Sequence, residues 1–303
     1  MTRSAVILSF ILVTAIGGST WIVIRDQLGV VPAPWSVAYR FIIASAVLAL
    51  VARIQRVSLR LPPGAGRIAL WFGITQFCIN FNAVYLAERH ITSGLVATVF
   101  ALLLIPNALL AWAWLGHRPG RRFILSSIPA IAGVVLLFIH ELRADPSGSG
   151  EVLFGLGLTL VGLLSASVAN VLQATRAASR VPLAAMLTWA MAIGAMIDIV
   201  IALLVAGPPS FDWRPGYVAG LFYLALVASA LAFSLYISLV RALGPARAAY
   251  STLLVPILAM TLSTLFEDYL WSPLAALGAL LALGGMVFAL TERRKLGTAA
   301  DPA

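Results

Sequence analysis

Long apolar runs alternate with short polar segments along the whole chain. A helix needs about 20 apolar residues to cross the hydrocarbon core of a bilayer. Ten runs come close to this length: 4–24, 34–52, 67–87, 92–115, 122–139, 152–172, 183–206, 217–239, 246–266 and 273–290. Each is predicted to be helical, because the bilayer interior offers no water to hydrogen-bond an exposed backbone. The pattern predicts an all-α integral membrane protein with ten transmembrane helices.

The second half of the chain repeats the order of landmarks in the first half. Small residues, an apolar run, a proline and a second apolar run make up Thr92–Gly116 and again Gly244–Glu267, with Pro256 at the place of Pro106. A period of about 150 residues indicates an internal duplication. We therefore predict a first five-helix repeat, an inter-repeat linker, a second five-helix repeat and a cytoplasmic tail at residues 1–144, 145–150, 151–292 and 293–303.

The charges between the runs predict the orientation. With the N-terminus in the cytoplasm, the cytoplasmic segments hold fifteen Lys and Arg residues, and the other side holds four: Arg25, Arg89, Arg143 and Arg214. Positive residues favour the cytoplasmic side, so both termini are predicted to be cytoplasmic. Because each repeat has an odd number of spans, the second enters the membrane inverted. Inverted repeats build many alternating-access transporters, which bind substrate near the midplane where the repeats meet.

Composition excludes several other classes of protein. The chain is 61% hydrophobic and 10% charged, with a mean hydropathy of +1.01, which is too apolar for a soluble domain of this size. Its net charge of +9 is spread over the segments between runs and forms no basic patch for nucleic acid. Cys78 is the only cysteine, so no intrachain disulfide can form. The first run also fits a cleavable signal peptide, but its length and its counterpart in the second repeat favour a retained span.

Polar side chains inside the runs are the candidates for substrate binding. The third run is the most polar, and Gln76 and Asn80 lie four residues apart, hence on one helix face. Facing lipid would leave their amides unsatisfied. They therefore either hydrogen-bond neighbouring helices or bind the amino or carboxylate group of a substrate. The same two alternatives apply to Asn107 in the fourth run and to Ser165 and Asn170 in the sixth.

Three aromatic residues complete the predicted site. Tyr85 and Tyr236 are 151 residues apart, so we expect them at symmetric places in the third and eighth spans. There they either line a central cavity or anchor the membrane interface. Trp21 follows the Gly17-Gly18 pair, which permits close helix packing. It either lines the same cavity or belongs to the aromatic belt at the interface.

Two charges and one proline lie deep within the predicted spans. Intramembrane charges point to function, and these are Arg40 in the second span and Asp198 in the seventh. Each is close enough to the outer interface to snorkel, the two are also candidates to pair, and direct contact with substrate is the third alternative. Pro106 removes one backbone hydrogen bond. It either kinks the fourth span or, in addition, frees a carbonyl near Leu102 toward the cavity.

These features resemble the drug/metabolite transporter superfamily, in its EamA-like branch. The resemblance rests on the ten spans in two halves, the repeated proline, the Leu-Gly-Glu-like ends of spans four and nine, and the sequence Pro34-Trp-Ser-Val-Ala-Tyr-Arg40-Phe. His117 departs from the family, which usually carries Glu there, whereas Glu267 keeps the carboxylate in the second repeat. The chain is also similar to bacterial aromatic amino acid exporters of the YddG type. That similarity implies export of aromatic and other small apolar amino acids across the inner membrane, through a cavity lined by spans 1, 3, 4, 6, 8 and 9.

Two other functions stay open. An exporter of drugs or other metabolites, such as cationic amphiphiles, would keep the same fold. An intramembrane enzyme is a distant alternative, because it needs zinc ligands or a triad at depth, whereas His90, His117 and His140 lie at span ends or in loops. We expect a transporter without catalytic residues, metal or cofactor, whose partners are a small amino acid and the lipid bilayer. With Asp198 as the sole acid inside the spans, facilitated export is favoured over proton coupling.

Overall fold

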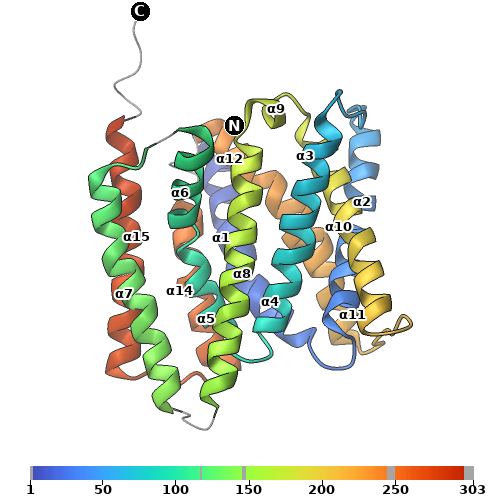
Figure 1. Cartoon of the computed structure of the whole chain (residues 1–303). Helices are drawn as coiled ribbons and strands as arrows, with labels where there is room; N and C mark the ends of the chain where they lie inside the picture. Colours follow the sequence, from blue (N-terminus) through green and yellow to red (C-terminus); the bar gives the residue numbers. More distant parts are fainter. Residues whose placement is uncertain (1–2, 117, 145–147, 244–249, 297–303) are drawn as a thin grey trace, which may run out of the picture. The chain divides into compact units, whose positions relative to one another are not determined.

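The computed structural model describes residues 3–116, 118–144, 148–243 and 250–296, and within these ranges it contains helices and no strands (Figure 1). The helices are α1 (Arg3–Asp26), α2 (Ala33–Ile54), α3 (Ala65–Phe72), η1 (Gly73–Asn80), α4 (Phe81–Ala87), α5 (Ser93–Ala101), α6 (Leu104–Leu115), α7 (Arg121–Ala144), α8 (Ser149–Gln173), α9 (Arg176–Ser179), α10 (Leu183–Val205), α11 (Pro215–Phe222), η2 (Tyr223–Leu231), α12 (Ala232–Leu243), α14 (Tyr250–Phe266) and α15 (Pro273–Leu296). The predicted all-α class is confirmed for these residues. Four parts of the predictions lie outside them: His117, 145–147 of the linker, 244–249 of the repeated motif and 297–303 of the tail.

Each of the ten predicted runs coincides with a helical segment, and the ends differ from prediction by a few residues. In the described part of the chain, eight segments are long and apolar enough to cross a membrane. The other two apolar helices, Leu254–Phe266 and Pro273–Phe288, are shorter over their described residues. Length and composition therefore support eight spans, and ten spans stay a prediction.

Packing divides the chain into two compact units, which are treated separately below. Unit 1 contains Met1–Ile22, His90–Leu156 and Ala232–Ala303, and unit 2 contains Val23–Arg89 and Gly157–Leu231. Each unit takes helices from both predicted repeats, and α1 and α8 contribute to both units. The repeat boundaries along the sequence stay a prediction.

In unit 1, α7 packs along α15 with backbone against backbone (Figure 1). A methyl group on Gly133 of α7 would lie 2.3 Å from the amide nitrogen of Ala282, and one on Gly285 of α15 would lie 2.6 Å from that of Ala130. Gly278 is as tightly enclosed, with the carbonyl oxygen of Gly133 at 2.7 Å from such a methyl group. Glycine lets two helices approach this closely in a membrane protein. Gly133, Gly278 and Gly285 therefore allow the backbones of α7 and α15 to come into contact.

A carboxylate joins the end of α14 to the start of α5 in the same unit. Glu267 accepts hydrogen bonds from the backbone nitrogen of Ser93 at 3.1 and 3.2 Å and from Ser93 Oγ at 2.7 Å, and also from Ser263 Oγ. Thr92, the N-cap residue of α5, makes no side-chain cap bond. The first N–H groups of a helix need acceptors, and the helix dipole favours negative charge there. Glu267 thus caps α5 from a different helix.

Proline interrupts the fourth span but not the ninth. The helix breaks between α5 and α6, just before Pro106, whereas α14 continues through Pro256. The carbonyl oxygen of Leu102, which Pro106 deprives of its helical donor, accepts from the amide of Ile105 at 2.8 Å. The predicted kink is confirmed. The predicted free carbonyl near Leu102 is wrong, because the tighter turn at the break supplies it with a donor.

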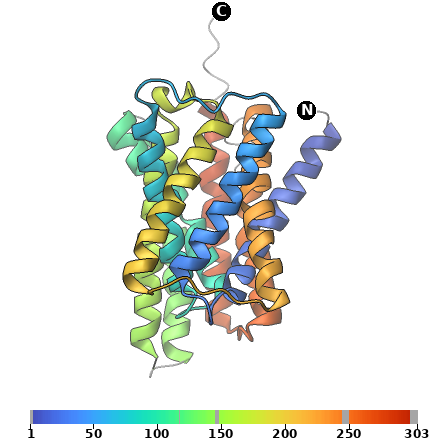
Figure 2. The same cartoon turned by 90° about the vertical axis from the view of Figure 1, so that its right-hand side faces the viewer.

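In unit 2, α2 and α10 lie side by side and antiparallel (Figure 2). Trp35, near the start of α2, donates from Nε1 to the carbonyl oxygen of Gly207, just past α10, at 3.3 Å. Trp189, near the start of α10, donates to the carbonyl oxygen of Leu59, past α2, at 2.8 Å. The end that carries Trp35 is the predicted outer end. It contains a buried apolar cluster: Val31, Trp35, Ala38, Ala202, Tyr217 and Leu221.

The third and eighth spans each contain a π-helical segment in the middle. η1 begins at residue 73 and η2 at residue 223, and each is flanked by α-helix on both sides. π-Helical segments are rare and occur frequently at functional sites. Their matching positions in the two halves support the predicted duplication, although the sequence analysis did not anticipate them.

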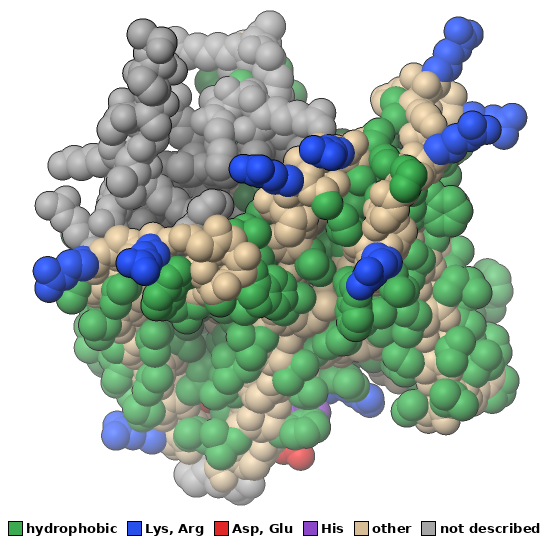
Figure 3. Space-filling view, turned by 45° about the horizontal axis from the view of Figure 1, so that its top comes forward, with side chains coloured by type: hydrophobic (Ala, Val, Ile, Leu, Met, Phe, Trp, Pro, Cys, Tyr) green, Lys and Arg blue, Asp and Glu red, His purple; other side chains and the backbone are tan. Residues whose placement is uncertain are grey.

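Exposed arginines of unit 2 gather at its predicted cytoplasmic end. Six are exposed in or beside the segments that join α2 to α3 and α8 to α10: Arg53, Arg56, Arg60, Arg67, Arg176 and Arg180. Figure 3 looks toward this end and shows Lys and Arg side chains near the loops, with hydrophobic side chains over the flanks of the helices. These arginines belong to the set from which the orientation was predicted, and the side of the membrane that this end faces stays a prediction.

Candidate substrate site

The predicted substrate-binding residues divide between the two units. Five lie in unit 2, on the third and sixth spans: Gln76, Asn80, Tyr85, Ser165 and Asn170. Three lie in unit 1, on the first, fourth and eighth spans: Trp21, Asn107 and Tyr236. The surroundings of each residue are therefore given within its own unit, and a single site that joins the two groups stays a prediction.

Gln76 and Asn80 lie in η1, and both side chains are buried. Asn80 Nδ2 donates to the carbonyl oxygen of Gln76 at 3.4 Å, within the same helix. Its Oδ1 is buried without a hydrogen-bond partner among the described residues. The Asn80 amide is thus satisfied only in part, and by its own helix instead of by a neighbour. Tyr85 follows on α4, where its side chain is fully buried beside the Arg40 guanidinium.

The two candidates on α8 differ in their surroundings. Ser165 is buried and donates to the carbonyl oxygen of Thr75 in η1 at 2.7 Å. This is a bond between helices, the structural alternative that the sequence left open for Ser165. Asn170, further along α8, has an exposed side chain. The Asn170 side chain is therefore accessible from outside the helix packing, whereas the Ser165 side chain is not.

In unit 1, Trp21 is half-buried on α1 and packs against Phe100 of α5, with the ring centroids 5.2 Å apart. The neighbouring Gly17 and Gly18 bring α1 against α14. A methyl group on Gly18 would lie 2.6 Å from Leu258 Cδ2. The close packing predicted for this glycine pair is confirmed, and it places the Trp21 ring next to the last turn of α5.

Tyr236 and Asn107 are both half-buried in unit 1. Tyr236, on α12, packs against the apolar cluster of Val13 and Leu239. Its counterpart Tyr85 is fully buried, so the two tyrosines have different surroundings although their spacing in the sequence is that of a repeat. Asn107 lies on α6, just after the break in the fourth span.

Arg40, on α2, is the centre of a buried polar network in unit 2. Its side chain is 1% exposed. Nε donates to Ser229 Oγ in η2 at 3.0 Å, and Ser229 Oγ donates to the carbonyl oxygen of Leu224 at 2.8 Å. The guanidinium carbon lies 4.4 Å from the centre of the Phe81 ring, which is a cation–π contact. The predicted snorkelling is wrong for Arg40, because neighbouring helices enclose its charge.

Asp198, on α10, has different partners. It is fully buried, and Oδ1 accepts from Asn82 Nδ2 at 2.7 Å. The same Asn82 nitrogen donates to the carbonyl oxygen of Cys78 at 3.0 Å. The predicted snorkelling of Asp198 is wrong, because its side chain is fully buried. Its pairing with Arg40 is also wrong, because Asp198 bonds to Asn82 of α4 whereas Arg40 bonds to Ser229 of η2.

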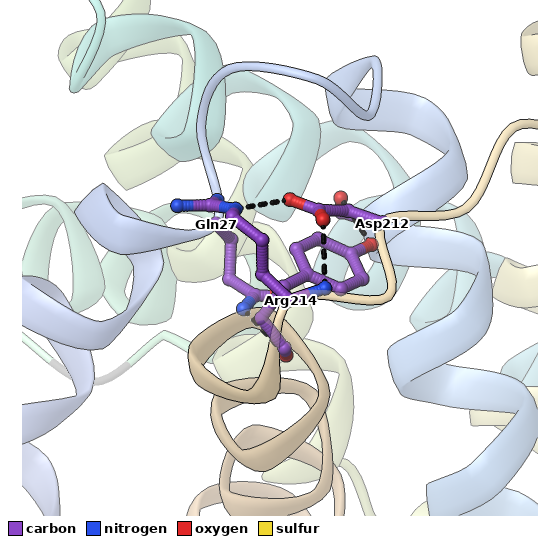
Figure 4. Close-up of polar contacts among 5 residues, drawn as sticks. Gln27, Asp212 and Arg214 are labelled. Atoms are coloured by element: carbon purple, nitrogen blue, oxygen red, sulfur yellow. Dashed lines mark hydrogen bonds and ion pairs between the residues drawn. The ribbon is translucent and has the colours of Figure 1, made fainter.

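A second polar cluster lies at the predicted outer end of unit 2, at the start of α11 (Figure 4). Arg214 donates to the Asp212 carboxylate from its backbone nitrogen at 2.9 Å and from Nε at 2.6 Å. These bonds hold the pKa of Asp212 below its ordinary value and raise the pKa of Arg214, so both are ionised at neutral pH. Gln27, beside them, donates from Nε2 to the carbonyl oxygen of Tyr217 at 3.0 Å. The cluster fixes the segment after α1 against α11.

α2 and α4 bring together the guanidinium of Arg40 and the phenol of Tyr85, while η1 carries the buried amides of Gln76 and Asn80. Such groups recognise carboxylates and other polar head groups by hydrogen bonds. Among the described residues, no set of three or more His, Cys, Asp or Glu side chains is placed to hold a metal ion. The sequence analysis left Arg40 and Glu267 out of the predicted site. Their signals were the Tyr39-Arg40-Phe41 sequence in the second span and the carboxylate at the end of the ninth.

Comparison with solved structures and known sequences supports the fold and places the chain in a family. A solved crystal structure has a similar fold over 97% of this chain and 99% of its own, with a TM-score of 0.68 and 23% identity. Protein PagO of Salmonella typhimurium is 22% identical over 278 residues, 89% of this chain and 86% of PagO. The uncharacterized transporter YvbV of Bacillus subtilis is 22% identical over 273 residues, 88% of this chain and 84% of YvbV. The profile of the EamA-like transporter family matches residues 4–139 and again 153–291. The chain therefore belongs to the EamA-like transporter family.

Proposed function

We propose that this EamA-like transporter exports aromatic and other small apolar amino acids across the bacterial cytoplasmic membrane by alternating access. In this proposal, residues 1–144 and 151–292 form inverted five-helix repeats with ten spans, both termini are cytoplasmic, and cargo binds between the repeats. The observation that carries the proposal is the double match of the family profile, once in each half. Repeats with inverted topology are the usual basis of alternating access.

The polar and aromatic groups of the described spans support an amino acid as cargo. Gln76, Asn80 and Tyr85 supply amide and hydroxyl groups around η1, where the backbone departs from the α-helix. Trp21 and Phe100 supply aromatic surface in unit 1. Cationic amphiphiles, the alternative cargo, would favour a carboxylate that the cargo can reach. Asp198 already accepts a hydrogen bond from Asn82, whereas the Tyr85 hydroxyl and Asn80 Oδ1 have no hydrogen-bond partner among the described residues, which supports a cargo with hydrogen-bonding head groups.

Counterflow in proteoliposomes tests the cargo directly. Vesicles preloaded with unlabelled Phe, Trp or Leu are expected to take up the same labelled amino acid transiently, and vesicles without protein are expected to take up none. A panel with a quaternary amine is run in parallel. Exchange of the amine without exchange of any of the three amino acids would transfer the assignment to the drug-type alternative. Without exchange of either class, the proposal of transport by this chain fails.

Asn80→Ala is expected to weaken cargo binding without destabilising the protein. Among the described residues, its side chain bonds only within its own helix and Oδ1 has no partner, so little packing energy is lost. Losing one hydrogen bond to a charged group of the cargo is expected to raise the half-saturation concentration of exchange roughly tenfold or more. The matched control is Ser165→Ala, which removes a bond between helices and should lower the melting temperature with an unchanged half-saturation concentration. The prediction is wrong if Asn80→Ala behaves as the control does.

Export is expected to proceed without proton coupling. A coupling group must face the pathway in both states, typically as an intramembrane acid. Asp198 is fully buried and bonded to Asn82, so it is not exposed to a pathway in this structure. Phe flux into vesicles at zero membrane potential should therefore be the same with and without a pH gradient. Uphill accumulation driven by the gradient, and abolished by Asp198→Asn, would contradict this prediction.

A further inference from the structure

We propose that Arg40 and Tyr85 form the carboxylate-binding site for the cargo, an inference that rests on the proposed function and names the recognition of one group of the substrate. Of the three alternatives that the sequence left open for Arg40, snorkelling is excluded by its burial and pairing with Asp198 by the separate partners of the two charges, which leaves direct contact with the cargo. Both residues lie in unit 2, on α2 and on α4, at the predicted outer half of their spans. Each of the two side chains has a buried hydrogen-bonding atom without a partner among the described residues.

Arg40 uses only part of its hydrogen-bonding capacity. A guanidinium carries five N–H donors in a fixed fork that matches a carboxylate. Nε is bonded to Ser229, and one face of the group lies over the Phe81 ring. Nη1 is buried without a hydrogen-bond partner in the described chain. A buried cationic donor without an acceptor is costly, so an arriving carboxylate would gain a strong partner there.

The Tyr85 hydroxyl is the second unused donor. The side chain is 0% exposed, and its oxygen has no hydrogen-bond partner with full geometry in the described chain. The hydroxyl lies within side-chain hydrogen-bonding reach of the Arg40 guanidinium. Because a guanidinium only donates, the O–H proton of Tyr85 has no acceptor there. One carboxylate oxygen on Arg40 Nη1 and the other on Tyr85 would satisfy both donors.

The surroundings of these donors match the remainder of an aromatic amino acid. Glu88, at the end of α4, acts electrostatically on both Arg40 and Tyr85, so it provides negative charge for the ammonium group. Phe41 and Phe81 pack edge to face with centroids 4.9 Å apart, next to the guanidinium. Protein encloses both donors in this structure, so the alternating access proposed above would have to open the site to the cargo.

Three related compounds separate recognition of the carboxylate from recognition of the ring. Phenylalanine carries both head groups, 3-phenylpropionate lacks the amine, and phenethylamine lacks the carboxylate. In wild-type vesicles, phenethylamine is expected to compete with labelled Phe roughly tenfold to a hundredfold more weakly than unlabelled Phe does. In Arg40→Lys and in Tyr85→Phe, the half-saturation concentration for Phe should rise by a similar factor while competition by phenethylamine stays unchanged. Tyr85→Phe keeps the ring and removes only the oxygen, so it remains informative if Arg40→Lys fails to fold.

A binding measurement keeps this proposal independent of transport. The melting temperature of the purified protein in detergent is expected to rise with 3-phenylpropionate in the wild type, and not in Tyr85→Phe. The control is Ser36→Ala, which removes a buried hydroxyl of α2 that is bonded to Tyr217 and should lower the melting temperature but keep the response to the carboxylate. If wild-type vesicles exchange Phe but phenethylamine competes as well as Phe does, the carboxylate site is wrong and the proposed function stands. If nothing is exchanged but 3-phenylpropionate stabilises the protein through Tyr85, the site stands and the proposed function fails. Absence of any stabilisation by 3-phenylpropionate overturns the site.

Discussion

Leucine in place of Gly285 is expected to disrupt the packing of α7 against α15 in unit 1. Already the first side-chain atom would lie 2.6 Å from the amide nitrogen of Ala130 and 2.8 Å from the carbonyl oxygen of Ser126. Both are backbone atoms of α7, so they cannot move aside unless the whole helix moves. Overpacking costs about 1–3 kcal/mol where side chains can adjust, and more where the backbone must shift. We therefore expect a loss of stability of at least about 3 kcal/mol.

The neighbouring glycine provides a matched control. Gly284 is on the same helix, and nothing lies within 4 Å of a methyl group placed there. Gly284→Leu adds the same atoms to the chain, but it meets no clash and gains helix propensity of roughly 0.5–1 kcal/mol. The melting temperatures of the wild type and both variants, purified in one detergent, decide the matter. Equal losses in the two variants would mean that side-chain size on α15 matters and the close contact at Gly285 does not.

The positions of the helices follow from the sequence because of the solvent that surrounds them. A span in a bilayer must satisfy its own backbone, so an apolar run of sufficient length is enough to predict a helix. All ten runs were located in this way. The type of helix could not be predicted, since both α- and π-helices satisfy their own backbone and the same apolar sequence can form either. Nothing in the apolar composition of Tyr223–Leu231 distinguishes it from its α-helical neighbours.

Contacts between distant helices could not be predicted from one sequence. Arg40 and Ser229 are 189 residues apart, and Ser93 and Glu267 are 174 apart. The snorkelling prediction used only the distance of Arg40 from the end of its span, as if a single helix stood in lipid. Neighbouring helices enclose the side chain instead, and their identity depends on which helices lie next to each other in the folded protein. The repeat period and the hydropathy of the sequence do not show which helices are neighbours.

The sequence predicted the burial of Gln76 and Asn80 in the candidate site, but not which atoms they bond to. Unsatisfied amides were expected to face protein, and Gln76 and Asn80 are buried as that argument requires. The sequence offered binding and helix–helix bonding as alternatives, and the structure separates individual residues between them. Ser165 bonds to another helix, whereas Asn80 keeps an unpartnered oxygen. This distinction depends on the partner of each atom, which only the structure supplies.

Alanine in place of Glu267 is expected to loosen the attachment of α14 to the start of α5 in unit 1. The carboxylate accepts hydrogen bonds from the backbone nitrogen and hydroxyl of Ser93 and from the hydroxyl of Ser263. Bonds to a charged group contribute about 1.5–3 kcal/mol each, and bonds that share one carboxylate are not additive. We expect a total loss of about 3 kcal/mol. Glu267→Gln should lose about half as much stability as Glu267→Ala, since one acceptor oxygen remains.

The residue next to Glu267 separates the cap from the mere presence of negative charge. Asp268 is exposed and adopts a left-handed backbone with φ 55°, where glycine is favoured. Asp268→Gly removes one negative charge from the same segment, and the melting temperature should stay constant or rise slightly. Ser93→Ala, alone and combined with Glu267→Ala, completes a double-mutant cycle. If Glu267 caps α5 through Ser93, the two losses should be less than additive. Additive losses, or equal losses in Glu267→Ala and Asp268→Gly, would show that charge in this segment, and not the cap on α5, stabilises unit 1.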